Sequence, residues 1–378
     1  MSKWEIVRLG DVLKYEQPAK YIVESTDYDY RYETPVLTAG QSFVLGYTNE
    51  VNNIFTDLPV VIFDDFTTAI KYVDFPFKVK SSAMKILKAT EKGNIKYLFY
   101  YMSTLKIDTQ LHKRYWISKY TKLQIPLPSM EVQRQIADVL DRASALIEKR
   151  KAQIDKLDLL VKSQFIEIFG DPVTNPKGWR KTNLVEVASK IGSGATPKGG
   201  KGSYKKSGVS LIRSMNVYNG KFEYRQLAFI DDIQAEQLKN VAVEENDILL
   251  NITGASVGRC CLTPNDVLPA RVNQHVSIIR PNKILNPIYL CYLMISQSYQ
   301  KKLHILGNTG GATREAITKK QIENLDIPIP TLELQAQFAD FAQQVETQKS
   351  LLQQSLAKLK LNYKSLTQKC FNGEVFNG

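Results

Sequence analysis

A short stretch rich in lysine, glycine and tyrosine contains the side chains of this sequence that are best suited to a chemical task. Between Glu186 and Glu223 there are six lysines and one arginine but no acidic residue, and Tyr204 and Tyr218 lie among them. Cations on a glycine-rich backbone can approach phosphate groups closely. The whole chain is also basic, with a formal net charge of +12. These features favour a polyanionic partner, of which nucleic acid is the commonest.

Two further polar loops occupy matching places, each shortly before a proline-containing strand. LHKRYWISKY (111–120) precedes IPLP, and GNTGGATREAI (307–317) precedes IPIP. Arg114 and Arg314 in these loops could each donate two hydrogen bonds to a guanine, and nearby amides could read adenine. A third basic and aromatic stretch is KYIVESTDYDYRY. The candidate DNA contacts are Lys20, Arg31, Lys113, Arg114, Tyr115, Thr196, Lys198, Lys201, Lys205, Arg213, Asn216, Thr309, Thr313 and Arg314.

Motifs that would indicate catalysis are incomplete. GATPKGGKGS, which starts at Gly194, resembles a phosphate-binding loop, but Gly200 stands where that motif requires lysine. NPKGW resembles the NPP[YFW] signature of amino-group methyltransferases, but Lys177 replaces its second proline. The three histidines form neither HExxH nor HxH, and GxSxG is absent. The motifs therefore favour recognition over catalysis.

Adjacent carboxylates and cysteines are the remaining candidates for a metal site. Asp64 and Asp65 follow a predicted strand, and we interpret them as a solvated turn rather than as metal ligands. No CxxC occurs, and Cys260 and Cys261 should point to opposite faces of a strand. We therefore expect no metal and no disulfide. The polar N-terminus and the absence of an apolar run of about 20 residues predict neither a signal peptide nor a membrane span, and a reducing cytoplasm fits best.

The elements that position the loops are repeated along the chain. LQIPLPSMEVQRQIADVL begins at Leu123, and LDIPIPTLELQAQFADFA begins at Leu325, 202 residues later. After each, apolar residues recur every three or four positions for roughly 38 residues, and the two sets coincide when shifted by 202. We predict two long helices that arose by duplication and pair as an antiparallel coiled coil. A pair of core helices within one bundle is the alternative.

A globular domain precedes each helix. WEIVRLGDV at Trp4 resembles WRKTNLVEV at Trp179, an offset of 175, so the second domain should be about 27 residues larger. Runs such as LPVVIF and DILLNI predict strands, and 94–105 and 286–303 predict helices, so that each domain is α+β. Ser129 and Thr331 should cap the long helices. The predicted segments are 1–128 (first recognition domain), 129–169 (first spacer helix), 170–178 (linker), 179–330 (second recognition domain) and 331–378 (second spacer helix and tail).

Taken in order, these motifs resemble the specificity (S) subunits of Type I restriction–modification enzymes. The resemblance covers essentially the whole chain. It rests on the paired W-x4-L-x-[DE]-V starts, GDPVTNPKGW, GATPKGG, DILLNITGASVGR followed by RVNQHVSIIRP, and the repeated I-P-[LI]-P. It implies two target-recognition domains that each read one half of a split, asymmetric DNA sequence, with the helices setting the gap. The first domain departs from the pattern, because LTAGQSFVLGYT (37–48) stands where a GATP loop is expected.

The same resemblance implies that the chain is not itself an enzyme. It would hold two adenine-N6 methyltransferase subunits on double-stranded DNA and, through them, two restriction and translocase subunits. S-adenosylmethionine, ATP and magnesium are then expected on those partners and not on this chain, in a prokaryotic cytoplasm. Two other interpretations stay open. One is a DNA methyltransferase or nuclease that acts on its own through a cryptic site, and the other is a coiled-coil adaptor that does not bind DNA.

Overall fold

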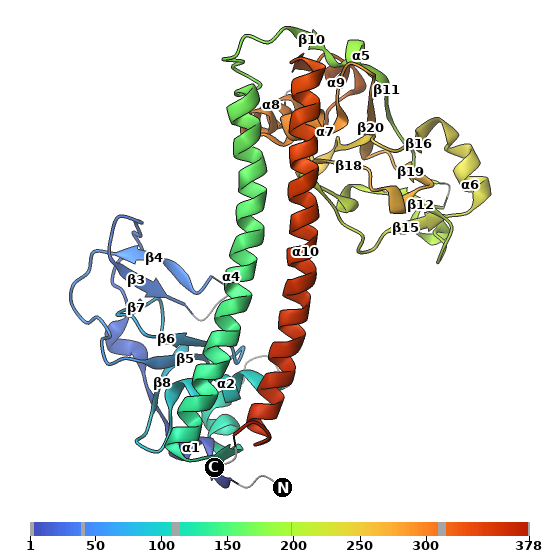
Figure 1. Cartoon of the computed structure of the whole chain (residues 1–378). Coiled ribbons are helices and arrows are strands. Elements are labelled where there is room, and N and C mark those ends of the chain that lie inside the picture. Colours follow the sequence, from blue (N-terminus) through green and yellow to red (C-terminus); the bar gives the residue numbers. More distant parts are fainter. Residues whose placement is uncertain (1–3, 39–41, 108–113, 198, 309–314, 377–378) are drawn as a thin grey trace. The chain divides into compact units, whose positions relative to one another are not determined.

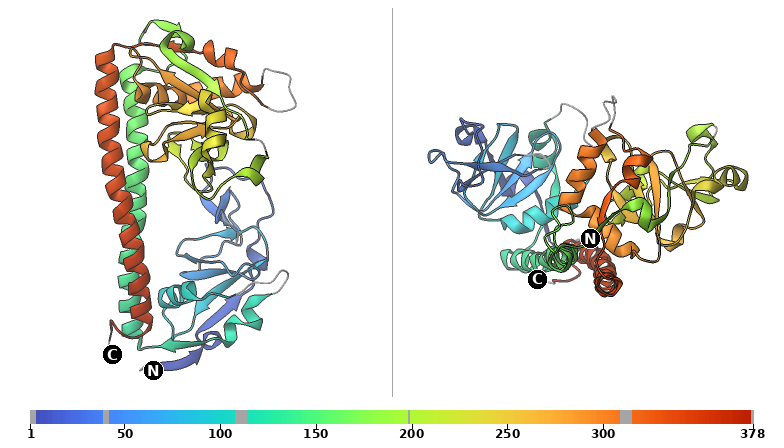
Figure 2. Two further views of the ribbon diagram at one scale, coloured as in Figure 1. Left: turned by 90° about the vertical axis from the view of Figure 1, so that its right-hand side faces the viewer. Right: turned by 90° about the horizontal axis from the view of Figure 1, so that it is seen from above.

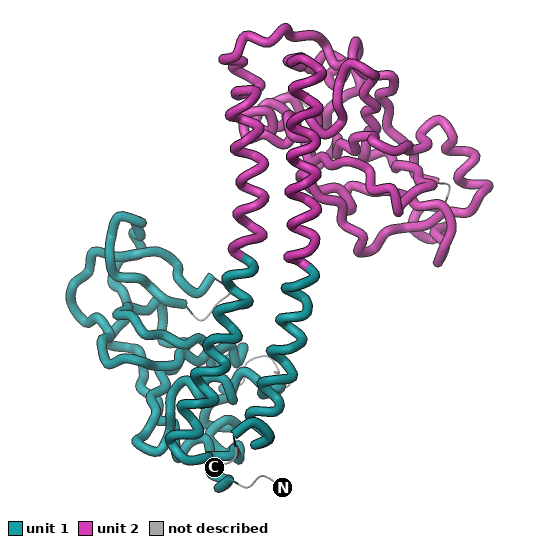
Figure 3. The backbone as a smooth tube through the Cα atoms, in the orientation of Figure 1, with its two compact units in different colours: residues 1–151, 354–378 teal, residues 152–353 magenta. Residues whose placement is uncertain are grey.

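The chain has the predicted α+β fold class and divides into two compact units. The computed structural model describes residues 4–38, 42–107, 114–197, 199–308 and 315–376. Unit 1 combines Met1–Lys151 with Gln354–Gly378, and unit 2 is Ala152–Gln353 (Figure 3). Each long helix contributes one part of its length to each unit.

Two helices of equal length dominate the secondary structure (Figure 1). They are α4 (Met130–Phe169) and α10 (Leu332–Phe371), each of 40 residues. Ser129 and Thr331 cap them as predicted, because their hydroxyl oxygens accept the N–H of Val132 and of Leu334 at 3.4 Å. Helix α4 ends at Phe169 and is followed by Gly170, whose φ of +75° favours glycine.

The two helices run antiparallel within each unit, where their segments lie side by side (Figure 2). In unit 2, Phe165 and Phe169 of α4 pack on Phe338 of α10, with ring centroids 5.4 and 5.5 Å apart. Further along, Lys349 Nζ lies 2.8 Å from Asp158 Oδ1. Residue numbers therefore rise along α4 as they fall along α10. In unit 1, the first turns of α4 share a core with the last turns of α10, so the predicted antiparallel pairing is confirmed in both units.

Unit 1 is built on a four-stranded antiparallel sheet in the order β2-β8-β5-β6. These strands are β2 (Leu13–Glu16), β8 (Met84–Ala89), β5 (Val60–Asp64) and β6 (Ile70–Val73). Beside it lie β4-β3-β7 (Val44–Thr48, Thr34–Leu37, Lys78–Val79) and the pair β1 (Glu5–Arg8) with β9 (Gln124–Leu127). The helices are α1 (Leu9–Val12), α2 (Ile95–Thr104) and α3 (Tyr115–Ser118). The core forms where α2 and α3 cover the four-stranded sheet, around Phe63, Tyr97 and Trp116.

Unit 2 contains two four-stranded sheets. The first has the order β11-β20-β17-β18 (Ala188–Ser193, Val276–Pro281, Ile248–Asn251, Cys260–Leu262). The second has the order β15-β12-β19-β16 (Ala228–Ile230, Val209–Ile212, Ala270–Val272, Ala242–Val243). Two pairs complete the set, β10 with β21 (Lys181–Asn183, Asp326–Pro328) and β13 with β14 (Val217–Tyr218, Lys221–Phe222). The helices are α5 (Leu184–Val187), α6 (Asp232–Gln237), α7 (Pro287–Ile295), α8 (Gln297–Asn308) and α9 (Lys319–Glu323).

The two units repeat one topology, which confirms the internal duplication. The order β2-β8-β5-β6 corresponds to β11-β20-β17-β18, and β3 pairs in parallel with β7 as β12 does with β19. Helices α2 and α7 follow equivalent strands and begin at equivalent asparagines. The side chain of Asn94 accepts the N–H of Lys96 and Tyr97, as that of Asn286 does for Ile288 and Tyr289. The repeated IPLP and IPIP motifs form the edge strands β9 and β21.

The two units differ most clearly in the length of the connection between two equivalent strands. The segment 213–227 connects β12 to β15, whereas the shorter segment 38–43 connects β3 to β4. The longer connection contains the β13–β14 hairpin.

A local difference from the sequence prediction occurs in 286–303, where we predicted one helix. Ser296 adopts extended backbone, with ψ of 148°, and separates α7 from α8.

Asp64 and Asp65 do not form the solvated turn that we predicted, because both side chains are buried. Asp64 Oδ1 accepts the N–H of Phe66 at 2.9 Å and closes the turn after β5. Asp65 Oδ1 accepts the N–H of Trp116 at 2.8 Å, and its Oδ2 lies 3.7 Å from Lys85 Nζ. The prediction was wrong because a pair of adjacent carboxylates does not reveal partners that are distant in the sequence.

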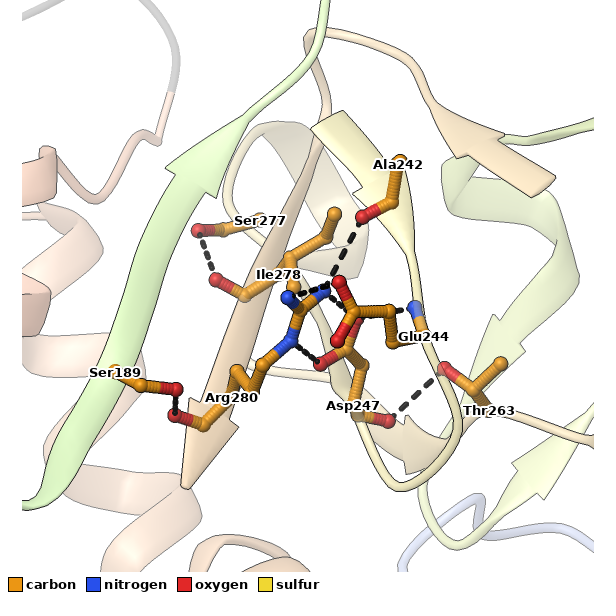
Figure 4. Close-up of polar contacts among 8 residues, drawn as sticks. All are labelled: Ser189, Ala242, Glu244, Asp247, Thr263, Ser277, Ile278 and Arg280. Carbon is orange, nitrogen blue, oxygen red and sulfur yellow. Dashed lines mark hydrogen bonds and ion pairs between the residues drawn. The ribbon is translucent and has the colours of Figure 1, made fainter. Parts of the chain in front are cut away.

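A buried ion pair joins the two four-stranded sheets of unit 2 (Figure 4). Arg280 on β20 donates from Nε to Asp247 Oδ1 at 2.7 Å and from Nη2 to Asp247 Oδ2 at 2.9 Å. The same guanidinium pairs with Glu244 and donates to the Ala242 carbonyl, which belongs to β16 of the other sheet. Asp247 raises the pKa of Arg280 above its usual value. In unit 1, Lys88 stands on β8 at the place equivalent to Arg280 and contacts two carboxylates.

All four cysteines are free and buried. Cys260 and Cys261 belong to different core clusters of unit 2, which confirms that they point to opposite faces of β18. Contact with Cys291, together with burial, raises the pKa of Cys260. Burial also raises the pKa of Cys261, and that of Cys370 to about 11. The thiols of Cys260, Cys261 and Cys370 therefore stay protonated at neutral pH.

Candidate DNA interface

The loop that follows β17 in unit 2 holds the base of the predicted recognition loop. Ile252 accepts the N–H of Ile317 at 2.9 Å, and Gly254 donates its N–H to the Glu315 carbonyl at 2.8 Å. Ala316 donates its N–H to Gly307 at 3.0 Å, which brings together the two ends of the segment that contains the GNTGGATR loop. Thr309, Thr313 and Arg314 were predicted to contact DNA and lie outside the described residues.

A chain of polar side chains lies beside this base. Thr253 Oγ1 is 2.6 Å from His275 Nδ1, and Gln274 Nε2 is 3.1 Å from His275 Nε2. Thr196 of the GATP segment donates its hydroxyl to Gln274 Oε1. We call Thr196, Thr253, Gln274 and His275 the polar loop surface. Hydroxyl, amide and imidazole groups of this kind can hydrogen-bond to base edges and to phosphates.

Gly194 explains why the GATP segment can approach the rest of the polar loop surface. A Cβ atom at this position would lie 1.6 Å from the Val272 carbonyl oxygen, so no other residue fits without moving the backbone. The Gly194 N–H donates to the Asn273 carbonyl at 3.2 Å. This contact places Thr196 within reach of Gln274, 78 residues further along the chain.

The basic residues of unit 2 that we predicted to contact DNA differ in whether they already have partners within the protein. Lys201 is exposed, whereas Lys205 is exposed but lies 3.2 Å from Asp231. Arg213 lies over the Tyr204 ring at 5.5 Å and donates to a backbone carbonyl. Lys198 lies outside the described residues. Lys201 is thus the cation of this group best able to meet a phosphate.

Asn216 and Tyr115 were predicted to contact DNA, but the structure buries both of them. Asn216 Oδ1 accepts the Arg213 N–H at 3.1 Å, and its Nδ2 donates to the Glu223 carbonyl at 2.8 Å. Tyr115 belongs to the core of unit 1. Both side chains therefore stabilise the fold and do not lie at the surface, where DNA could contact them.

Unit 1 anchors its own predicted loop in the equivalent way. Tyr115 donates its N–H to the Asp65 carbonyl at 3.0 Å, just as Ile317 donates to Ile252 in unit 2. Arg114, immediately before Tyr115, is exposed. Lys113 lies outside the described residues. In both units, therefore, the turn after the same sheet strand (β5 or β17) holds the segment that follows the loop.

Lys20 and Arg31 are exposed but already have acidic partners in unit 1. Lys20 Nζ lies 3.1 Å from Glu16 Oε1, and Arg31 Nε lies 3.0 Å from Asp29. Glu16 also accepts from Lys88 Nζ at 2.8 Å. The Lys88 contact is the main cause that lowers the pKa of Glu16 to about 2. DNA would have to compete with these carboxylates for both cations.

The contact between Glu16 and Lys88 should stabilise unit 1 at neutral pH and lose this effect in acid. A carboxyl group whose pKa is lower in the folded state stabilises the fold above its unfolded pKa of about 4.5, and this contribution is lost as the pH falls towards 2. After allowance for solvent screening we expect about 1 to 2 kcal/mol at pH 7. Urea unfolding of wild type and Glu16→Gln between pH 2 and 7 measures it. The difference between the two proteins should shrink at low pH, and a constant difference would contradict the assignment.

An open cavity in unit 2 lies beside the β13–β14 hairpin and was not predicted from the sequence. Tyr218, Asn219, Lys221, Glu223 and Arg259 line it. The Arg259 guanidinium lies 4.9 Å from the centre of the Tyr218 ring. The sequence indicated neither this cavity nor a role for Thr253, Gln274 and His275, because the side chains concerned meet only in the folded chain. The one available signal was that NITGASVGR and RVNQH carry the family resemblance.

Within the described ranges, no group of three or more His, Cys, Asp or Glu side chains is arranged to hold a metal ion. None of the described helices is both long enough and apolar enough to cross a membrane.

Comparison with known proteins gives consistent matches along the chain. The family model described as "Type I restriction modification DNA specificity domain" matches residues 1–157 and again residues 176–361. The specificity subunit of the Type I restriction enzyme EcoR124I/EcoR124II of Escherichia coli is 30% identical over 356 residues, covering 91% of this chain and 87% of that protein. The MjaVIII specificity subunit of Methanocaldococcus jannaschii is 26% identical and covers 89% and 84%.

Solved structures support the same fold. The S subunit of a Type I restriction–modification system from M. genitalium superposes with a TM-score of 0.63 at 14% identity, covering 98% of this chain and 96% of that one. A chain from a structure of complex assembly and conformational transition in a type I R-M system gives a TM-score of 0.56 at 21% identity, with 98% of each chain covered. Two family matches, a relative at 30% identity and the duplicated fold together show that this chain belongs to the specificity subunits of Type I restriction–modification enzymes.

Proposed function

We propose that this chain reads a bipartite, asymmetric DNA target and directs adenine-N6 methyltransferase and restriction subunits to it. The observation that carries the proposal is the matched anchoring of one loop segment in each unit, through Tyr115 to Asp65 and through Ile317 to Ile252. The anchors are the same, whereas the loops differ in sequence. Such a pair suits two readers of unlike half-sites. In this proposal 1–128 and 179–330 are the recognition domains.

The proposed contacts divide by chemistry. In unit 2, Lys201 and the cavity residues Lys221 and Arg259 would meet phosphates, because an extended cation binds the backbone whatever the sequence. The polar loop surface and the Arg314 loop would face base edges, where hydroxyl, amide and guanidinium groups discriminate between bases. In unit 1, Arg114 would have the base-reading role. DNA binding should therefore weaken steeply as the salt concentration rises.

The long helices offer two equivalent sites for partner subunits. Leu159 on α4 and Leu361 on α10 are 202 residues apart in sequence, and are 63% and 68% exposed. One leucine belongs to unit 2 and the other to unit 1. Exposed leucines at duplicated positions suit two copies of one partner. We propose that two methyltransferase subunits dock there and bring S-adenosylmethionine, and that the restriction subunits bring ATP and magnesium.

Replacing these leucines by lysine should reduce partner binding in steps. Leu159→Lys or Leu361→Lys alone should leave one methyltransferase subunit bound, and the double variant none, because a charge would enter each apolar contact. Native mass spectrometry of the co-expressed complex counts the subunits. Leu351→Lys is a matched control, since Leu351 is also exposed while its equivalent position already holds Lys149. Full occupancy in the double variant would exclude these sites.

The function itself is tested by mapping N6-methyladenine in cells with and without this chain. The proposal expects one split motif that disappears with the chain, and an Arg114→Ala variant that relaxes one half of the motif only. Equal relaxation of both halves would contradict independent domains. Methylation by the purified chain alone with S-adenosylmethionine would favour a solitary enzyme. A lack of salt-dependent DNA binding would favour an adaptor.

A further inference from the structure

A buried glutamine occupies the first turn of each long helix. Gln133 of α4 is 1% exposed and Gln335 of α10 is 0% exposed, and the two are 202 residues apart. Gln133 Oε1 accepts the N–H of Asn94 at 2.7 Å, and Gln335 Oε1 accepts the N–H of Asn286 at 2.8 Å. These asparagines are the N-caps of α2 and α7. The same side chain therefore joins a long helix to a helix of its domain in both units.

The amide nitrogen of each glutamine makes two more bonds. Gln133 Nε2 donates to the carbonyls of Pro128 at 2.9 Å and Lys92 at 3.0 Å. Gln335 Nε2 donates to the carbonyls of Pro330 at 2.9 Å and Ile284 at 3.4 Å, the latter a longer bond. One acceptor and both amide hydrogens are thus used, which only a primary amide of this length can do. A carboxylate would lose both donors, and an apolar side chain would leave buried carbonyls without partners.

A tyrosine fixes the same junction from the other side. Tyr97 of α2 donates its hydroxyl to the Pro126 carbonyl at 2.6 Å, and Tyr289 of α7 donates to the Pro328 carbonyl at 2.8 Å. The strand-to-helix exit is therefore held at two points to one domain helix. This arrangement restricts the angle between the recognition domain and the start of its long helix.

We infer that Gln133 and Gln335 are positioning residues that set the DNA gap by fixing this angle. The inference rests on the proposed function. A helix of 40 residues is about 60 Å long, so an error of about 5° at its first turn displaces its far end by roughly 5 Å. That distance is more than one base-pair step of about 3.4 Å. Helix length alone cannot define a gap unless the angle at the junction is also fixed.

The test measures gap preference rather than total activity. The complex with its methyltransferase subunits methylates duplexes that carry both correct half-sites and a gap that is correct, one base pair shorter or one base pair longer. Gln133→Met and Gln335→Met keep the side-chain length but remove its three hydrogen bonds. We expect the ratio of methylation at the correct gap to that at the wrong gaps to fall at least about 10-fold, with base preference in each half-site unchanged.

Matched controls and a milder variant make the result decisive. Gln135→Leu and Gln337→Leu change exposed glutamines two residues further on, which donate hydrogen bonds to Glu131 and Glu333 of their own helices, and should keep the wild-type ratio. Tyr97→Phe removes a single hydroxyl and is the variant to measure if the glutamine variants do not fold. It should also lower the ratio of methylation at the correct gap to that at the wrong gaps.

One outcome would contradict the inference about the glutamines, and a different outcome would contradict the proposed function. A uniform fall at every gap, with the ratio unchanged, would make the glutamines merely structural and would refute the inference. Absence of any gap preference in the wild-type complex would refute the proposed function itself.

Discussion

Inserting seven residues into both long helices, after Lys151 and after Gln353, should lengthen the recognised gap by about three base pairs. Seven residues extend a helix by about 10 Å, and DNA rises about 3.4 Å per base pair. Two helical turns also keep the buried seam around Ile147 and Ile154 nearly in phase. The insertion points are equivalent, 202 residues apart, and coincide with the division between the two units. Methylation of the original site should fall at least about 100-fold.

Mapping N6-methyladenine in cells that express the lengthened chain measures this shift directly. The half-site sequences should stay the same, because the insertion changes no residue of either recognition loop. Lengthening α4 alone is the control, since it breaks the register with α10 and should abolish methylation at every gap. A lengthened chain that still methylates the original gap would exclude the helices as the spacer.

Replacing Asp247 by asparagine should destabilise unit 2 by about 3 kcal/mol. Asp247 is fully buried and accepts from Arg280 at 2.7 and 2.9 Å and from the Glu244 N–H at 2.7 Å. Asparagine has nearly the same shape but leaves the mostly buried guanidinium without its main countercharge. The cost should be at the lower end of the range for a broken buried pair, because Glu244 also contacts Arg280.

Glu244→Gln is the matched control for the same arginine. The side chain of Glu244 is 62% exposed while that of Asp247 is 0% exposed, so its loss should cost less than about 1 kcal/mol. Hydrogen exchange of peptides that cover β17 and β20 measures both variants, and the β8 peptide of unit 1 serves as an internal reference. Equal effects of the two substitutions would show that burial does not set the strength of this contact.

The long helices could be predicted because local sequence determines them. Apolar residues recur with helical period, no Gly or Pro interrupts them, and Ser129 and Thr331 stand where caps are required. The shared phase of the two patterns also predicted duplication, and the presence of a separate domain at one end of each helix predicted the antiparallel pairing. Two polar residues of the long helices were misleading, since Gln133 and Gln335 look like ordinary surface residues in the pattern but are buried.

The candidate site was harder to predict because its contacts join distant parts of the chain. Thr196 was included, but its partner Gln274 was not, since nothing local connects two residues that are 78 positions apart. Asn216 has the residue type of a base-reading side chain, yet the turn before β13 uses both ends of its amide. Residue type and spacing can indicate a polar loop, but burial depends on the tertiary fold.

The four buried cysteines give this protein a practical advantage for spectroscopy. Their buried thiols should react slowly with maleimide reagents, because the reagent cannot reach them in the folded chain. An introduced cysteine at an exposed position such as Lys14 or Lys206 could then be labelled selectively in the otherwise native chain. A fluorophore pair at these two positions would report the separation of the two units in solution, and whether DNA or partner subunits change it.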